Sequence, residues 1–316
     1  MFTDFAKEMG DAFRLRHALV PQLYSALGFA SEESLAYPVR SLFVDFPELE
    51  LAMEWSDRQF MYCDNVTVAP VTRPGLVGDF AAAGSTQAPE SIRQLMFVPP
   101  GEWMEWGGAR SHIGPGTATI DLQSTATLPA LVKAGSVLFM QPWNATDGGD
   151  TMDKATAIIA VLFPSSAWTQ DTSALHLAGN TTQLAAGSFR LYEDDSSSPP
   201  ATMGAPLRAR LAHGGPRASC ITTVSYQVAW ATTDTGGAVT LRGRVGPSIG
   251  SACREGARRI EVHVRGASAL GIAGSDHQPT IAEDPMCTAC TTDGTLIVLN
   301  KQVDLMHEFA SFDLAL

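Results

Sequence analysis

Glu193, Asp194 and Asp195 form a run of three consecutive carboxylates, a side-chain type that can give or take protons in catalysis. Consecutive side chains of a strand point to opposite faces, so these three make a poor pair for one substrate. In a turn, an aspartate side chain accepts a hydrogen bond from its own backbone. We therefore interpret the run as an acidic turn that ends a strand.

Residues 102–106 combine two glutamates, Glu102 and Glu105, with two tryptophans, Trp103 and Trp106. An aromatic face beside a carboxylate is suited to stacking on a sugar ring, which would make this cluster a binding subsite. Closely spaced tryptophans also fill the core of a β-sandwich. We favour the core position for both tryptophans.

Histidine and cysteine spacing predicts neither a metal site nor a nucleophile. Cys287 and Cys290 form a C-x-x-C pair, but a zinc site needs a second pair of ligands and a redox motif needs a strand-to-helix context. With Cys63, Cys220 and Cys253 they are interpreted as thiols without a role or as one local disulfide. No two histidines have the spacing of a metal-binding helix, and they are His17, His112, His176, His213, His263, His277 and His307. There is no G-x-S-x-G motif, and we predict no metal and no cofactor.

The chain has 316 residues and a net charge of −12, which restricts its partners. Nucleic acids and anionic membranes attract clustered Lys and Arg, so neither is expected, whereas a neutral sugar is compatible with an acidic surface. The longest apolar stretch, residues 155–164, has the length of a strand and not of a membrane span. Residues 1–16 lack the basic start and apolar core of a signal peptide, and the localisation stays open.

Residues 1–47 have the pattern of an α/β fold. Residues 4–28 repeat apolar side chains at helical spacing, and Pro21 is expected to kink or restart this helix. Residues 38–46 have the pattern of a strand that is apolar on both faces, which is typical of a parallel sheet covered on both sides. Because such a strand needs neighbours that the preceding residues do not supply, we expect those neighbours to lie outside this chain.

From residue 59 onward the chain consists of short β segments separated by Gly and Pro, the pattern of β-sandwiches. A polar, Gly-rich stretch at 144–155 is the expected linker between two such domains. The predicted strands are 60–71, 93–99, 117–122, 128–132, 137–141, 156–163, 187–192, 220–231, 239–244, 259–264 and 295–299.

Six segments within residues 13–195 follow one another in the order of a known set of motifs. They are 14–24 (RLRHALVPQLY), 38–47 (PVRSLFVDFP), 59–71 (QFMYCDNVTVAPV), 97–108 (FVPPGEWMEWGG), 128–138 (LPALVKAGSVL) and 189–195 (FRLYEDD). Together they resemble the C-terminal part of family 31 glycoside hydrolases, the α-glucosidase type. The chain departs from the family pattern at Ser41, Cys63, Asn65 and Ser196, where the family has proline, glycine, an acidic residue and glycine, respectively.

The resemblance implies a mostly β fold: two C-terminal β-sandwich domains, at 48–143 and 156–316, preceded at 1–47 by the last helix and strand of a truncated (β/α)8 barrel. Family 31 enzymes are mostly retaining α-glycosidases, in which two carboxyl groups lie about 5–5.5 Å apart. In the family, both catalytic aspartates precede the helix that begins here near Phe13. We therefore assign no catalytic residue and expect the chain by itself to be inactive. Asp45, at the end of the barrel-like strand, is a candidate for facing the sugar.

Two functions remain open at this point. The first is a fragment of a retaining O-glycosyl hydrolase acting on α-glucosides, with a carbohydrate substrate and the upstream catalytic barrel of the same protein as partners. The alternative is a non-catalytic β-sandwich protein that binds carbohydrate or a partner. The helix and strand of residues 13–47 favour the first, because a free-standing binding module does not need them.

Overall fold

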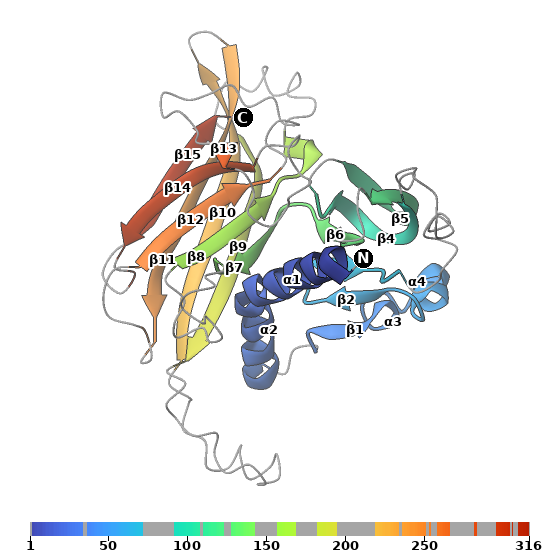
Figure 1. Cartoon of the computed structure of the whole chain (residues 1–316). Coiled ribbons are helices and arrows are strands. Elements are labelled where there is room, and N and C mark those ends of the chain that lie inside the picture. Colours follow the sequence, from blue (N-terminus) through green and yellow to red (C-terminus); the bar gives the residue numbers. More distant parts are fainter. Residues whose placement is uncertain are drawn as a thin grey trace.

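The structure is a computed structural model of the chain. It describes residues 2–33, 37–71, 92–107, 110–122, 128–142, 157–168, 182–194, 219–233, 236–250, 253, 258–265, 281–282, 295–303, 305 and 309–315. The described residues form three β-sheets, a pair of long helices, α1 and α2, and two short helices, α3 and α4 (Figure 1). The prediction of a mostly β chain is confirmed.

Sheet A has six strands in the order β1-β2-β3-β6-β4-β5, all antiparallel. Its core is closed by the short helices α3 (Leu42–Asp45) and α4 (Glu50–Trp55), which bury Leu42, Ala52 and Trp55. The strands are β1 (Val39–Ser41), β2 (Phe60–Tyr62), β3 (Val66–Val68), β4 (Ile92–Glu105), β5 (Ser111–Leu122) and β6 (Ala130–Lys133).

Sheets B and C pack face to face as a sandwich. Their inner faces share one apolar core, to which Phe139 and Val262 of sheet B and Trp230 and Leu241 of sheet C belong. Sheet B, in the order β13-β14-β12-β8-β7, consists of β7 (Ser136–Met140), β8 (Ala157–Phe163), β12 (Arg258–Val264), β13 (Ile281–Ala282) and β14 (Thr295–Val303). Sheet C, in the order β15-β11-β10-β9, consists of β9 (Thr182–Asp194), β10 (Ser219–Thr233), β11 (Gly236–Ile249) and β15 (Ala310–Ala315).

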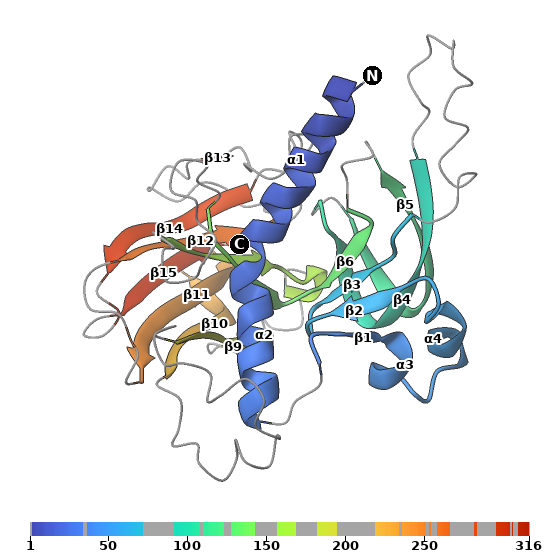
Figure 2. The same ribbon diagram turned by 60° about the horizontal axis from the view of Figure 1, so that its bottom comes forward.

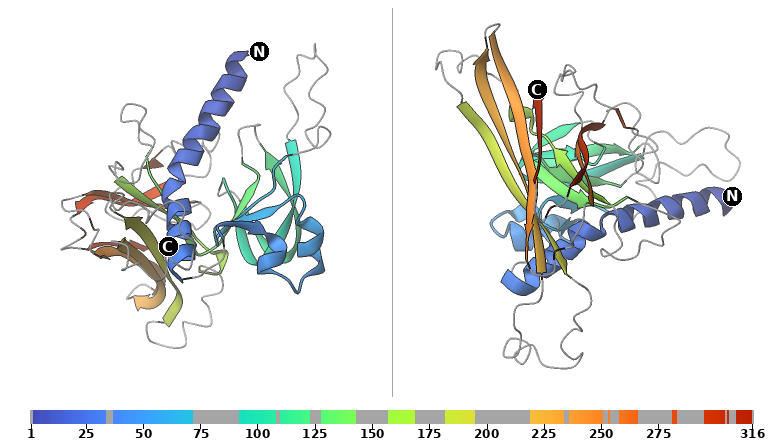
Figure 3. Two further views of the ribbon diagram at one scale, coloured as in Figure 1. Left: turned by 90° about the horizontal axis from the view of Figure 1, so that it is seen from below. Right: turned by 90° about the vertical axis from the view of Figure 1, so that its left-hand side faces the viewer.

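The helix pair lies between the sandwich and sheet A (Figures 2 and 3). Helices α1 (Phe2–Ala18) and α2 (Val20–Glu33) are separated at Leu19, just before Pro21, so the predicted helix with a restart at this proline is confirmed. Proline is tolerated in the first turn of α2 because its missing N–H would have no intrahelical partner there. Apolar residues of α1, sheet A and sheet B form a third core between the two β bodies, which includes Leu19, Trp106 and Phe163.

The expected doubly covered strand at 38–46 is wrong. Strand β1 has three residues, pairs antiparallel with β2, and is an edge strand of sheet A. The chain then turns into α3, whose N-terminus is capped by the Ser41 hydroxyl, which accepts from the Phe43 N–H at 3.3 Å. This local cap redirects the apolar run: Leu42 enters the core, while Phe43 and Val44 point outward and are 42 % and 57 % exposed.

The β2–β3 turn depends on a non-glycine residue with a left-handed backbone. Cys63 has φ +53°, a conformation that glycine adopts more readily. Arg40 holds the turn, because its guanidinium donates to the Cys63 carbonyl oxygen at 3.0 Å and to Asp64 Oδ1 at 2.9 Å. The departure from the family glycine is therefore accommodated by contacts from β1.

One disulfide joins β10 to the residues that precede β12. Cys220 and Cys253 are bonded, with their Cα atoms 4.7 Å apart, and Cys63 is a free, buried thiol. The sequence left a single disulfide open without assigning its partners. Cys287 and Cys290 lie outside the described residues.

Candidate functional site

Glu193, the first carboxylate of the run 193–195, is engaged within the fold. Glu193 is buried near the end of β9, and both of its oxygens accept from Arg258 Nη1, at 2.7 and 2.8 Å. Strand β9 extends to Asp194, so Glu193 and Asp194 lie in the strand and not in the predicted turn after residue 192, and Asp195 lies outside the described residues. Glu193 thus joins β9 to β12 across the sandwich and has no access to a substrate.

Residues 102–106 are structural, as favoured from the sequence. Trp103 and Trp106 are buried in two different cores, with 1 % and 6 % exposure, so neither face is open to a sugar. Glu105 is buried and accepts from Arg110 Nε and pairs with His112 Nε2, each at 3.0 Å. The subsite alternative is excluded for the two tryptophans by their burial.

Glu102 connects sheet A to the segment that follows β8. Its carboxylate accepts from Ser165 Oγ at 2.5 Å and from the Ser166 N–H at 3.0 Å, at the start of a short 3-10 helix (Ser166–Trp168). Burial opposes ionisation of Glu102, but hydrogen bonds from Ser165, Ser166 and Ser111 outweigh it and hold the pKa of this carboxyl below its usual value. The group is an interdomain anchor.

Asp45 lies on α3 and not at the end of a barrel strand. Its Oδ1 accepts from Arg40 Nε at 2.6 Å, within the ion-pair network that also holds Asp64. The candidate sugar-facing role is therefore not supported by its placement, because α3 replaces the strand on which the expectation rested.

A row of charged side chains along β12 alternates with apolar residues, and the sequence assigned it no role. Arg259, Glu261, His263 and Arg265 alternate with apolar residues and so lie on one face, where Glu261 Oε2 is 2.8 Å from His263 Nε2. The hydrogen bond from His263, opposed by burial, lowers the pKa of Glu261. The alternation itself was the available signal, but it does not reveal that Glu261, His263 and Arg265 are buried while Arg259 is exposed.

Four histidines of the sequence lie outside the described residues: His176, His213, His277 and His307. Within the described ranges, no three His, Cys, Asp or Glu side chains are grouped as metal ligands would be. No helix in that part of the chain has the length and apolarity of a membrane span.

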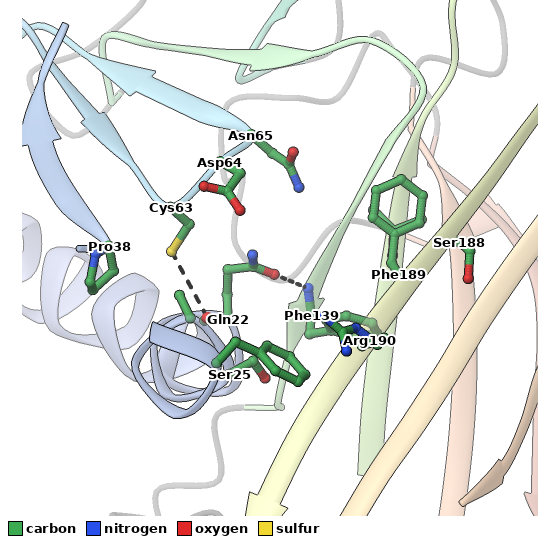
Figure 4. Close-up of a pocket in the computed structure, with 13 residues that line it drawn as sticks. Gln22, Ser25, Pro38, Cys63, Asp64, Asn65, Phe139, Ser188, Phe189 and Arg190 are labelled. Carbon is green, nitrogen blue, oxygen red and sulfur yellow. Dashed lines mark hydrogen bonds between the residues drawn. The ribbon is translucent and has the colours of Figure 1, made fainter. Parts of the chain in front are cut away.

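A pocket of about 250 Å³ opens where α2, the β2–β3 turn, β7 and β9 meet (Figure 4). We call it the α2–β9 pocket. It is lined by Gln22, Ser25, Ala26, Phe29, Pro38, Cys63, Asp64, Asn65, Val137, Phe139, Ser188, Phe189 and Arg190.

Hydrogen bonds from α2 fix the walls of the α2–β9 pocket. Gln22 Oε1 accepts from the Phe139 N–H at 2.9 Å, which ties α2 to β7. Ser25 Oγ accepts from the Tyr192 N–H at 3.0 Å and donates to the Pro21 carbonyl oxygen, which ties α2 to β9. The Cys63 thiol donates to the Gln22 carbonyl oxygen at 3.9 Å.

The thiol in this wall is a donor and not a nucleophile. Burial, reinforced by Asp64, raises the pKa of Cys63 to about 12, so the sulfur stays protonated at neutral pH. Sequence reasoning missed the pocket. A weak signal was present, because the polar residues Gln22 and Ser25 interrupt the otherwise apolar face of a helix that had to pack.

Residues 36–138 match the family described as the glycosyl hydrolase family 31 C-terminal domain. No curated protein matches the chain. The chain shares its fold with a family 31 dextranase from Flavobacterium johnsoniae in complex with isomaltotriose, at 16 % identity and a TM-score of 0.57, over 95 % of this chain and 32 % of that one.

Two further solved structures have the same fold. A family 31 α-xylosidase from Xanthomonas citri is 20 % identical with a TM-score of 0.54, covering 97 % of this chain and 25 % of its own. An α-1,4-glucan lyase from Gracilariopsis lemaneiformis is 11 % identical with a TM-score of 0.56, covering 99 % and 28 %. The chain thus spans a third or less of the length of these proteins. Residues 36–138 thus match the family 31 C-terminal domain, and the chain shares its fold with part of each of these three enzymes.

Proposed function

We propose that the chain is the C-terminal, non-catalytic part of a retaining glycoside hydrolase that acts on α-glucosides. The observation that carries the proposal is the match of residues 36–138 to the family 31 C-terminal domain. The proteins of similar fold are carbohydrate-active and much longer than this chain. Catalysis then belongs to a (β/α)8 barrel, and this chain supports that barrel.

The state of the carboxylates supports an inactive chain. Retaining hydrolysis requires two carboxyl groups about 5–5.5 Å apart, open to one sugar. The acidic residues considered from the sequence are instead engaged by cations or serines: Glu193 by Arg258, Glu105 by Arg110, Asp45 by Arg40, and Glu102 by Ser165. Each partner is fixed within the fold, so these groups stabilise the chain and do not act on a substrate.

The surface around α3 and α4 suits attachment to a barrel. Val39, Phe43, Val44, Leu51 and Met53 are all at least 38 % exposed, and they come from β1, α3 and α4. The two short helices lie together at one corner of sheet A (Figure 2). A cluster of exposed large apolar residues is typical of an interface. We assign this face, the β1–α3–α4 face, to the catalytic barrel.

The chain by itself, assayed with an aryl α-glucoside, is the direct test. We expect no turnover. Reproducible turnover by purified protein, lost on heat denaturation, would place the catalytic groups inside this chain and contradict the proposal.

The alternative is a non-catalytic protein that binds carbohydrate or a partner, and the α2–β9 pocket is the observation in its favour. An immunoblot of native protein, with an antibody against residues 156–316, separates the two. A band much larger than the 316-residue chain supports the enzyme. A band of the size of this chain favours the binding protein.

A further inference from the structure

We propose that the disulfide Cys220–Cys253 is a redox-sensitive device that controls the contact between sheets B and C. When a dithiol reduces this bond, the buried ion pair of Glu193 and Arg258, which joins the same two sheets, separates. The inference does not rest on the proposed function, because all four residues belong to the sandwich and to the chain that enters β12.

The disulfide and the ion pair lie at the same end of the sandwich. Cys220 and Glu193 are directly opposite each other on β10 and β9, and both are buried, so their side chains share the inner face of sheet C. Arg258 is the first residue of β12 in sheet B, and Cys253 precedes it by five residues. A covalent bond and an ion pair therefore connect neighbouring positions of sheet C to the start of β12.

The ion pair uses one nitrogen of the guanidinium. Arg258 Nη1 donates to both oxygens of Glu193, at 2.7 and 2.8 Å. The Nε and Nη2 atoms of Arg258 are buried and have no acceptor among the described residues. Burial deprives these N–H groups and the two charges of water, which is costly, and release of Arg258 to solvent would restore their hydration. The buried position of Arg258 therefore needs a further constraint.

The disulfide supplies this constraint on Arg258. Five residues of extended chain span at most about 18 Å, so a bond that fixes Cys253 on β10 limits how far Arg258 can move from Glu193. The strand pairing at this point is weaker than further along β12. Among the described residues, Arg258 is paired with Val303 of β14, whereas pairing with β8 begins at Arg259.

Reduction takes place by two thiol–disulfide exchanges. Cys253 is half-buried and Cys220 is 3 % exposed, so the thiolate of a dithiol attacks the Cys253 sulfur. The Cys220 sulfur leaves with the electron pair of the broken bond and takes a proton from water. The second thiol of the reductant loses its proton and displaces the Cys253 sulfur, which is protonated in turn. Two electrons thus pass from the dithiol, which becomes a disulfide, to the protein, which gains two thiols.

The test compares urea unfolding of the oxidised chain with that of the chain treated with dithiothreitol. Cys287 and Cys290 are replaced by serine, and Cys63 is buried, so the thiols released in the folded chain are those of Cys220 and Cys253. Reduction should lower the midpoint of unfolding by about 1 M urea or more. Reoxidation with oxidised glutathione should restore it.

A double variant examines the coupling of the disulfide to the ion pair. Glu193→Gln/Arg258→Gln removes both charges, so reduction should lower its midpoint by no more than about half as much as that of the wild type. Glu105→Gln/Arg110→Gln is the control, because it removes another ion pair of a buried carboxylate, at sheet A. This control should show the full effect of reduction.

Amide hydrogen exchange locates the change without substitution of the ion pair. On reduction, the amides of residues 258–260 should exchange about tenfold faster or more, because the start of β12 loses its constraint. The amides of β4 should keep their exchange rates, since this strand lies in sheet A.

Three outcomes overturn the proposal. They are failure of dithiothreitol to release the two thiols while the chain is folded, an equal fall of the midpoint in the wild type and in Glu193→Gln/Arg258→Gln, and unchanged exchange at residues 258–260. None of these results bears on whether the chain supports a catalytic barrel, so the two proposals fail separately.

Discussion

The first 55 residues form two surfaces that are rich in apolar side chains: the β1–α3–α4 face, and the side of α2 that packs on β7 and β9. These two surfaces differ in what they contact. Helix α2 buries Phe29 to 8 % exposure and ties itself to both strands through Gln22 and Ser25. The β1–α3–α4 face leaves Phe43 at 42 % exposure. One apolar segment is therefore buried within the chain, whereas a neighbouring apolar segment stays exposed and is available to a surface outside the described residues.

The largest expected effect distinguishes two phenylalanines on these surfaces. Phe29→Ala should lower the free energy of unfolding by about 3 kcal/mol, because it removes a buried ring that packs edge-on to Tyr192. Phe43→Ala should cost less than about 1 kcal/mol in the isolated chain, since much of its ring is already in water. Urea unfolding measures both, and equal losses would show that the two surfaces are not different in kind.

Two glycines sharpen the comparison along the helix pair. A Cβ on Gly28 would lie 2.5 Å from Cδ1 of Tyr192, so Gly28→Ala should destabilise the chain by about 2 kcal/mol. A Cβ on Gly10, in α1, meets nothing closer than Arg14 Nη1 at 4.0 Å, so Gly10→Ala should stabilise by about 0.5–1 kcal/mol. The two substitutions should shift the midpoint of thermal unfolding in opposite directions. A stabilising effect of Gly28→Ala would contradict the close approach of α2 to β9.

Substitution of Glu102, which connects sheet A to the sandwich, should have a smaller effect on the free energy of unfolding, and this effect should depend on pH. Its folded-state pKa is lowered, so its contribution is present above the unfolded pKa of a glutamate, about 4.3, and is lost as pH falls through the lower folded value. Glu102→Gln should therefore lower the free energy of unfolding near neutral pH, where the ionised carboxylate contributes, change it little at low pH, and so flatten the acid limb of the stability profile. An unchanged acid limb in urea titrations at several pH values would argue against the anchor.

The smallest effect on stability is expected at the β1–α3–α4 face. Val44→Glu should change the unfolding free energy of the chain by less than about 0.5 kcal/mol, because Val44 is 57 % exposed. The exposed apolar residues of this face are expected to drive association of the isolated chain, and Val44→Glu should reduce that association. Ile249→Glu, on β11 at a position that is 72 % exposed, is the control and should not reduce self-association as strongly. Sedimentation velocity compares the two, and an identical response would mean that the face has no special role in association.

Local patterns predicted those features that depend on neighbouring residues. The helix restart follows from Pro21, whose ring constrains the backbone wherever the helix packs. The burial of Trp103 and Trp106 follows from their size and from the short β segments around them. The segment order over residues 13–195 pointed to the same family whose C-terminal domain residues 36–138 match.

Features that depend on residues far apart in the chain were not predictable. The apolar run at 38–46 has the composition of a strand, and its conversion to α3 rests on a cap by Ser41 and on the core contacts of Leu42. The α2–β9 pocket unites Gln22, Asn65 and Ser188, which no spacing rule connects. The same holds for the pair of Cys220 and Cys253.

The crossing from sheet A to sheet B has a mechanical consequence. Strand β6 ends at Lys133 in sheet A and β7 begins at Ser136 in sheet B, so only Ala134 and Gly135 join the two bodies there. The Gly135 carbonyl oxygen also accepts from the Tyr226 hydroxyl at 2.5 Å, which fastens the crossing to the sandwich. A connection of two residues is too short to act as a hinge. Under an applied force, sheet A and the sandwich of sheets B and C should therefore move as one rigid unit and unfold together.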